Sequence, residues 1–242
     1  MSIENITPEQ AAHEARKVVG FVSKFMTHPA TYAYGAELGF DGADFYVAGR
    51  GGALGDVPAD VVTAAFIYFE PGVVRAGWAR SAPVMSRRRA AEEWAGRCHA
   101  WAREHLPEDR DWPMLAALVG RVCAGASVAC APLFAGWRDL EEPADPRELA
   151  LHRLNGLREL RGALHGAAVL TVGLRPLEAV VVRSPDMLRF FGWPEPHPDP
   201  EPLRDRWALA EARTDRMFGR HLAALDAGER GALVDMLGTL SA

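Results

Sequence analysis

The sequence predicts a mainly α-helical protein with at most a few short strands. One indication lies near the start of the chain, where Thr7 can cap a helix that opens on Pro8, with Gln10 three residues after the cap. A second indication is residues 157–168, where leucine and alanine recur every three or four positions and so share one helix face. Similar patterns recur along most of the chain, so helices are expected to dominate the fold.

The first half of the chain divides into several expected helices. A helix is predicted over residues 7–26, with Val18, Val22 and Phe25 on its buried side. Residues 48–55 are rich in glycine and are expected to form a turn ahead of the next helix, which starts near Pro58. The other helices expected in this half cover residues 30–38, 58–68, 72–79, 86–106 and 112–130.

An acidic, proline-containing loop at residues 139–146 is the best internal boundary. It divides the chain into an N-terminal half, residues 1–138, and a C-terminal half, residues 146–242. The second half should open with a long helix, in which Gly156 and Gly162 are potential breaks. The remaining expectations are a helix end or short strand at residues 177–182, irregular structure in the proline-rich residues 192–202, and helices over residues 203–225 and 227–240.

Composition and charge limit the classes of function. The chain has 242 residues and a formal net charge of −5, which argues against a strongly electropositive nucleic-acid-binding surface, so DNA is a less expected partner. No apolar run approaches the roughly 20 residues of a membrane helix, and the N-terminus does not resemble a secretory signal. We therefore expect a cytoplasmic protein without a membrane partner.

The cysteines do not indicate a metal site or a disulfide framework. Cys98, Cys123 and Cys130 are odd in number and form no CxxC pair, which is typical of free thiols in an intracellular chain. The histidines lack the HExxH spacing of a zinc enzyme. No metal and no cofactor are expected.

Two separated clusters of ionisable residues are the candidate functional site. Arg50 lies in the glycine-rich segment just before a helix start, where backbone N–H groups favour an anion. Arg158, Glu159, Arg161 and His165 lie close together on the long helix. If the clusters meet, the arginines would bind an anionic substrate, and Glu159 or His165 would transfer a proton. Alternatively, both clusters are salt bridges that only fix how the helices pack.

Two further residues near Arg50 are candidates. Asp44 and its neighbour Asp41 could divide acid and base roles, which makes Asp44 a third catalytic candidate, or they could serve a turn or a helix cap. Tyr46 is a candidate substrate-binding residue, and Tyr68 could also line a pocket, although half-buried tyrosines are common in protein cores.

Three segments, residues 48–71, 151–174 and 211–225, resemble the landmarks of an actinobacterial helix-turn-helix family distantly related to MarR-type regulators. The resemblance extends from about residue 25 to residue 225 and implies two fused winged-helix-like halves packed through long helices. The chain departs from the family after Trp193, where a proline-rich segment replaces the expected helix and two-stranded wing. It also has apolar Leu160, Ala163 and Leu164 on the long helix. A divergent member without the second wing is expected.

Three functions remain open. The first is a cofactor-independent enzyme, or a small-molecule-binding protein, of specialised metabolism that acts on a small anionic substrate, for example a lyase or cyclase that releases sulfate or phosphate. The second is a ligand-responsive regulator that binds DNA, as a homodimer formed through residues 203–225. The third is a non-catalytic partner subunit of a hetero-oligomer, which docks through the proline-rich residues 194–202.

Overall fold

The computed structural model describes residues 6–240, and no strand occurs within that range, so the mainly α-helical class is confirmed. Six α-helices of the described residues begin at a proline, and in α1, α3, α6 and α10 the residue before that proline caps the helix with its side chain. The elements are α1 (Pro8–Glu14), α2 (Lys17–Met26), α3 (Pro29–Glu37), α4 (Asp44–Gly52), α5 (Ala59–Phe66), α6 (Pro71–Ser81), α7 (Arg87–His105), α8 (Trp112–Gly125), α9 (Pro132–Arg138), α10 (Pro146–Thr171), α11 (Pro176–Arg183), the 3-10 turns η2 (Pro185–Met187) and η3 (Glu201–Leu203), α12 (Arg204–Leu222) and α13 (Ala227–Leu240).

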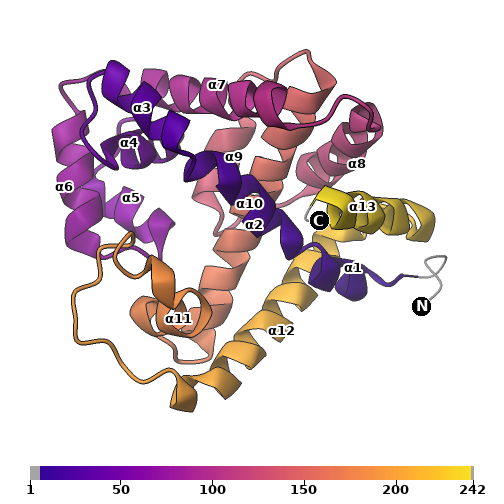
Figure 1. Cartoon of the computed structure of the whole chain (residues 1–242). Helices are drawn as coiled ribbons and strands as arrows, with labels where there is room; N and C mark the ends of the chain where they lie inside the picture. The colour runs from indigo at the N-terminus through magenta and orange to yellow at the C-terminus, as the bar shows by residue number, and fades with distance from the viewer. Residues whose placement is uncertain (1–5, 241–242) are drawn as a thin grey trace.

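The long helix α10 is the centre of the fold and packs against α2, α7, α8, α9 and α12 (Figure 1). The carboxylate of Asp145 caps its first turn by accepting hydrogen bonds from the next backbone N–H groups. The helix is continuous through Gly156 and Gly162. An interior glycine weakens a helix by only about 1 kcal/mol, and burial of one face along 26 residues outweighs that loss.

The predicted glycine-rich turn at residues 48–55 is wrong, because most of this segment is the buried helix α4. Its glycines permit a close approach to α7. A Cβ at Gly49 would lie 2.6 Å from the Cβ of Trp94, and a Cβ at Gly52 would overlap the backbone carbonyl oxygen of Arg87. These glycines therefore serve helix packing rather than a change of chain direction.

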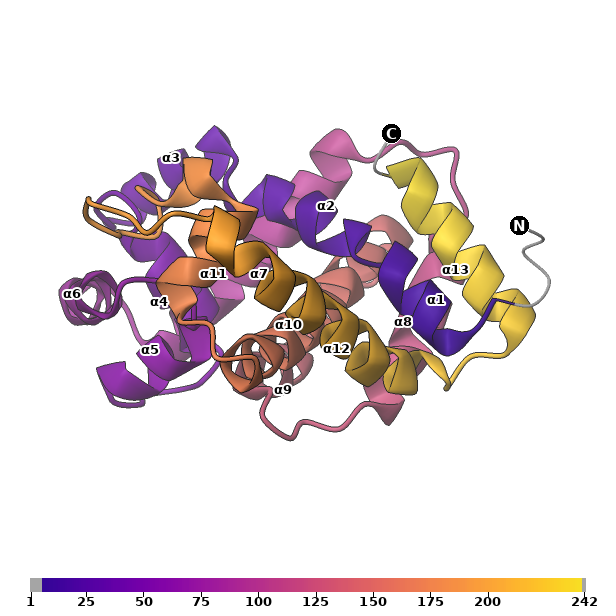
Figure 2. The ribbon, with the colours of Figure 1, turned by 90° about the horizontal axis from the view of Figure 1, so that it is seen from below.

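The single helix predicted over residues 7–26 is two helices, α1 and α2, which break at Ala15 and Arg16. They have different partners: α1 packs against α12 and α13, whereas α2 packs against α7, α10 and α13. Figure 2 shows α1 beside α12, so the start of the chain lies against its last helices.

The wing strands that the family resemblance implies are absent from residues 6–240. Residues 177–182 lie in the helix α11 rather than in a strand, and the segment between α6 and α7 is a short connection. Between Trp193 and η3 the chain is irregular, as the four prolines of this region predict, since proline cannot donate a backbone hydrogen bond.

The two predicted halves share one continuous hydrophobic core, which includes residues from Ile6 to Leu240. The division at residues 139–146 therefore stays a prediction about sequence organisation. Within residues 6–240 no single helix is long and apolar enough to span a membrane. Taken together, α10 and α11 have the length and the composition of a membrane span, but they meet at a 111° bend.

Candidate ligand-binding site

A cavity of about 830 Å³ lies among α2, α5, α10 and α11. Most of its wall is apolar, and Tyr46, Phe66, Phe190 and Phe191 contribute aromatic rings. Small-molecule sites in proteins typically have volumes of about 300–1,000 Å³, apolar walls and a few well-placed polar groups. The volume and the wall of this cavity fit a small organic ligand.

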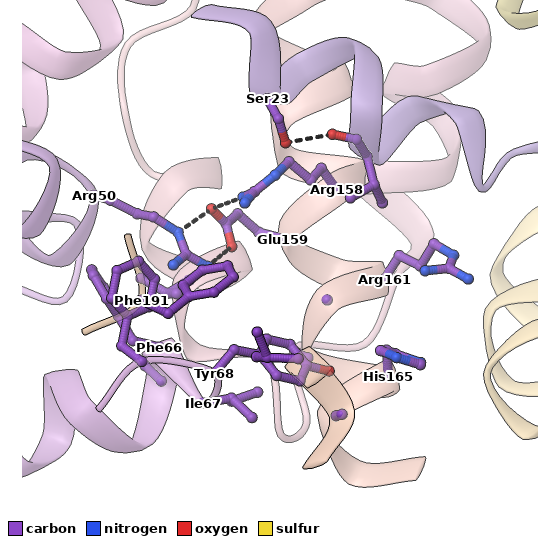
Figure 3. A pocket seen from close by; sticks show the side chains of 18 of the residues that line it. Ser23, Arg50, Phe66, Ile67, Tyr68, Arg158, Glu159, Arg161, His165 and Phe191 are labelled. Atoms are coloured by element: carbon purple, nitrogen blue, oxygen red, sulfur yellow. Dashed lines mark hydrogen bonds and ion pairs between the residues drawn. The ribbon is translucent and has the colours of Figure 1, made fainter. Parts of the chain in front are cut away.

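Arg50, Arg158 and Glu159 form one polar wall of the cavity (Figure 3). Arg50 donates from Nε and Nη2 to the two carboxylate oxygens of Glu159, at 2.8 Å each, and Arg158 donates from Nη1 to Oε1 at 2.7 Å. Burial alone would raise the pKa of Glu159, but the two guanidinium charges outweigh it and hold the pKa below its ordinary value. The structure thus joins the two clusters that the sequence places far apart.

Arg161 and His165 form a second polar wall, one helical turn further along α10. Arg161 donates from Nη2 to Glu211 at 2.9 Å. Thr214 donates its hydroxyl proton to the carbonyl oxygen of Ala210 at 2.8 Å, so its oxygen must accept the 2.8 Å hydrogen bond from Nδ1–H of His165. Burial lowers the pKa of His165 to about 4, so the ring is neutral at pH near 7 and its Nε2 carries a lone pair.

Two more polar side chains line this end of the cavity, Tyr68 and Arg183. The hydroxyl of Tyr68 has no hydrogen-bond partner within residues 6–240, and burial raises its pKa. Arg183 is an exposed residue that lines the cavity, and the protein atoms packed around its guanidinium lower its pKa. Sequence reasoning missed Arg183, because it ends a segment that fits a helix or a strand and shows no charge pattern.

The turn between α5 and α6 lines the same cavity and is strained at Ile67. This residue has φ 54° and ψ −62°, and Tyr68 N–H donates to the carbonyl oxygen of Phe66 at 2.6 Å, which together define a γ-turn. A positive φ is unfavourable for a β-branched side chain, and such strain gathers at functional sites. Ile67 packs on Gly166 of α10, where a Cβ would overlap its terminal methyl group.

Asp44 lies apart from the other candidate residues, and its assignment as a catalytic residue stays a prediction. It is buried at the start of α4 but does not line the cavity. Its carboxylate accepts hydrogen bonds from Nη2 and Nε of Arg80 on α6, at 2.6 and 2.8 Å. Asp44 therefore links two helices through an ion pair.

Tyr46 lies in the cavity wall as a buried aromatic residue, as a candidate binding residue should. Its ring stands edge-on to those of Phe66 and Phe190, with centroids 6.0 and 5.5 Å away. The guanidinium of Arg50 lies 4.6 Å from the centroid of Phe66, a distance typical of a cation–π contact. For metals, the part of the chain that the structure describes contains no group of three or more histidine, cysteine, aspartate or glutamate residues that could hold an ion.

The comparisons with known proteins give one family. A family described as a helix-turn-helix family matches residues 11–197. No curated protein and no solved structure matches the chain. Within the matched range, α5 and α6 are joined by a turn of four residues, 67–70, which is typical of a helix-turn-helix unit.

Proposed function

Because the chain belongs to this helix-turn-helix family, we propose that it is a ligand-responsive protein that binds one small organic molecule in the cavity. The cavity carries the proposal. It combines an apolar wall with two polar groups that make no hydrogen bond within residues 6–240, namely the Tyr68 hydroxyl and Nε2 of His165, which lies 3.6 Å from Oε1 of Glu211. Buried polar groups are normally hydrogen-bonded, so unpartnered ones beside a cavity favour a ligand that would satisfy them.

We propose binding without a chemical step, because the main candidate base is already occupied. Glu159 accepts three hydrogen bonds from Arg50 and Arg158, and its side chain is 4% exposed. A carboxylate with a lowered pKa and three charged donors is a poor proton acceptor. Its role in the proposal is to hold the two arginines in the cavity wall.

The strained turn at Ile67 supports a response to the ligand. It joins α5 to α6 and contributes to the cavity wall, so a ligand that contacts Ile67 would act directly on the connection of the helix-turn-helix unit. A ligand shifts a conformational equilibrium only through contacts that differ between the two states. A residue with an unfavourable backbone conformation is a suitable place for such a difference.

The test is a fluorescence titration with Nile red, a neutral apolar dye whose emission increases in apolar surroundings. Gly162 lines the cavity and has open space where a Cβ would lie, so Gly162→Trp should partly fill it. Gly96 on α7 also has open space but lies outside the cavity, so Gly96→Trp is the matched control. We expect saturable binding to the wild type and to Gly96→Trp, and at least tenfold weaker binding to Gly162→Trp.

Two results would contradict this proposal. One is the absence of saturable dye binding to the wild type. The other is equal binding to both tryptophan variants, which would place the dye outside the cavity. Far-ultraviolet circular dichroism of the three proteins shows whether each variant keeps its helices, so that a loss of binding is not confused with a loss of fold.

DNA binding is a second candidate, favoured by the family membership and by the α5–α6 unit, whose second helix would enter the major groove. The surface charges do not add support, because four arginines of α6 and α7 each pair with a carboxylate: Arg75, Arg80, Arg88 and Arg89. A mobility-shift assay with DNA from upstream of the protein's own gene would test it. A complex that weakens as salt increases would support DNA binding, and no complex at low salt would refute it.

A further inference from the structure

One end of the cavity contains three polar groups for which the described part of the chain provides no hydrogen bond. They are the guanidinium of Arg183, the hydroxyl of Tyr68 and Nε2 of His165, which lies 3.6 Å from Oε1 of Glu211. The rings of Tyr68 and His165 have centroids 6.1 Å apart, and the charge of Arg183 is close enough to act on both side chains. Figure 3 shows the Tyr68 hydroxyl directed toward the His165 side of the pocket. These groups form one cluster.

Arg183 differs from the other three arginines that line the cavity, Arg50, Arg158 and Arg161, because each of those pairs with a glutamate. The carboxylate of Glu211 acts on the charge of Arg183, but it is already held by Arg161. Arg16 also contacts that carboxylate, at 3.2 Å. Arg183 therefore presents a guanidinium with free donors to the cavity, and a charge-assisted hydrogen bond from it suits an anion.

His165 and Tyr68 require different groups on a ligand: His165 needs a hydrogen-bond donor, and Tyr68 needs an acceptor. His165 donates from Nδ1 to Thr214, so its Nε2 can only accept a hydrogen bond. Oε1 of Glu211 lies 3.6 Å from Nε2 and is also an acceptor, so a donor is missing between these two atoms. The His165 side chain is 3% exposed, so bulk water does not replace the missing donor. The hydroxyl of Tyr68 is a free donor and suits a negatively charged oxygen.

The other part of the cavity is mainly aromatic, and the guanidinium of Arg50, 4.6 Å from the centroid of Phe66, is already held by Glu159. Phe66, Phe69, Phe190 and Phe191 gather there, and the ring centroids of Phe69 and Phe191 are 4.7 Å apart. This aromatic wall suits an aromatic or aliphatic body more than a sugar or a nucleotide, whose many hydroxyl and phosphate groups would find no partners there.

We propose that the ligand is an apolar monocarboxylate that carries an O–H or N–H donor next to its carboxylate. The carboxylate would accept hydrogen bonds from Arg183 and Tyr68, and the neighbouring donor would bind Nε2 of His165. The body of the ligand would pack against the phenylalanine side chains. This inference deepens the proposed function and rests on it, since it names the class of molecule that the same cavity takes.

Three dansyl compounds test the two polar requirements without any change to the protein. N-dansylglycine has a carboxylate and an adjacent N–H donor. N-dansylglycinamide lacks the negative charge, and N-dansylsarcosine lacks the N–H. We expect the wild type to bind N-dansylglycine at least tenfold more tightly than the amide and about threefold to tenfold more tightly than the sarcosine compound, in fluorescence titrations.

Variants assign these preferences to residues. Arg183→Gln should remove the preference for the carboxylate over the amide and leave the affinity for the amide unchanged. Arg189→Gln is the control: it is exposed, lies near the cavity but outside its wall, and changes the net charge equally. His165→Leu should remove only the preference for the N–H compound over its N-methyl analogue.

The outcomes separate the ligand class from the binding function. Equal affinity of the wild type for all three dansyl compounds, or no dansyl binding by a protein that binds Nile red, would overturn the carboxylate proposal and leave the binding function standing. No binding of either dye type would refute the binding function itself. Equal losses in Arg183→Gln and Arg189→Gln would overturn the contact with Arg183 and indicate a long-range charge effect.

Discussion

Replacing Glu159 with glutamine should destabilise the protein more than replacing either arginine that it binds. Glu159 is 4% exposed and accepts hydrogen bonds of 2.7–2.8 Å from Arg50 and Arg158, whose side chains are 11% and 14% exposed. In Glu159→Gln the side chain keeps its shape, but both buried guanidinium groups lose their counter-charge. Breaking a buried pair in this way typically lowers the free energy of unfolding by about 3–5 kcal/mol.

The reciprocal change should be milder. Arg50→Met leaves Glu159 paired with Arg158, so no charge is left without a partner. Against a total stability of about 5–15 kcal/mol, the Glu159→Gln effect corresponds to a fall of roughly 6–20 °C in Tm for a chain of this size. Urea and thermal unfolding followed by circular dichroism would measure both variants.

The result that refutes this reasoning is a Glu159→Gln protein that unfolds like the wild type. It would mean that the carboxylate does not hold the two arginines in the cavity wall. Glu159 would then be free for proton transfer, which is the enzymatic role that the sequence suggested for it.

Other predictions follow from burial and from the glycines. Because burial lowers the folded-state pKa of His165 from about 6.5 to about 4, its neutral form supports the fold above pH ~6.5, and this support is lost as the pH falls toward ~4. At pH ~5 the loss is on the order of 2 kcal/mol, and His165→Gln should flatten the acid limb of stability measured against pH by that amount. Gly162→Ala should raise the free energy of unfolding by about 0.5–1 kcal/mol, because its Cβ meets open space in a helix. Gly52→Ala should lower it by about 1–3 kcal/mol, because its Cβ would overlap the backbone of α7; urea midpoints with the same sign for both glycine variants would contradict this account.

The helical class and most helix starts could be predicted because their causes are local. Caps and first-turn prolines act within a few residues, as at Thr7 and Asp145. The segment at residues 48–55 was mispredicted because glycine occurs both in turns and where two helices pack closely, and the sequence does not show which of these applies. Its helical conformation follows from the proximity of Trp94, about 45 positions away in the chain.

The candidate site was predictable in part. Arg50 and Glu159 could be selected as members of two charged clusters, but their pairing across 109 positions depends on the packing of α4 near α10. Arg183 and the conformation of Ile67 had no sequence signal. An arginine indicates an anion site only when no carboxylate lies beside it in the folded protein, and the sequence does not show this. A positive φ is unfavourable for isoleucine, so the local sequence would not predict it at Ile67. Both properties arise from the tertiary structure.

In the proposed function, the position of Ile67 would give a ligand a physical route to the α5–α6 helix pair. On one side the turn at Ile67 contacts Gly166 of α10, between the helical turns that carry Arg161 and Leu170. On the other side it leads directly into α6. Among the described residues of the cavity wall, only Ile67 and Cys130 are non-glycine residues with a positive φ. A ligand held by Arg183 and packed against Ile67 would contact one of these two strained residues directly. Since strain of this kind amounts to about 1–3 kcal/mol, relief or reinforcement by the ligand would shift the α5–α6 unit between two arrangements by roughly 5-fold to 150-fold.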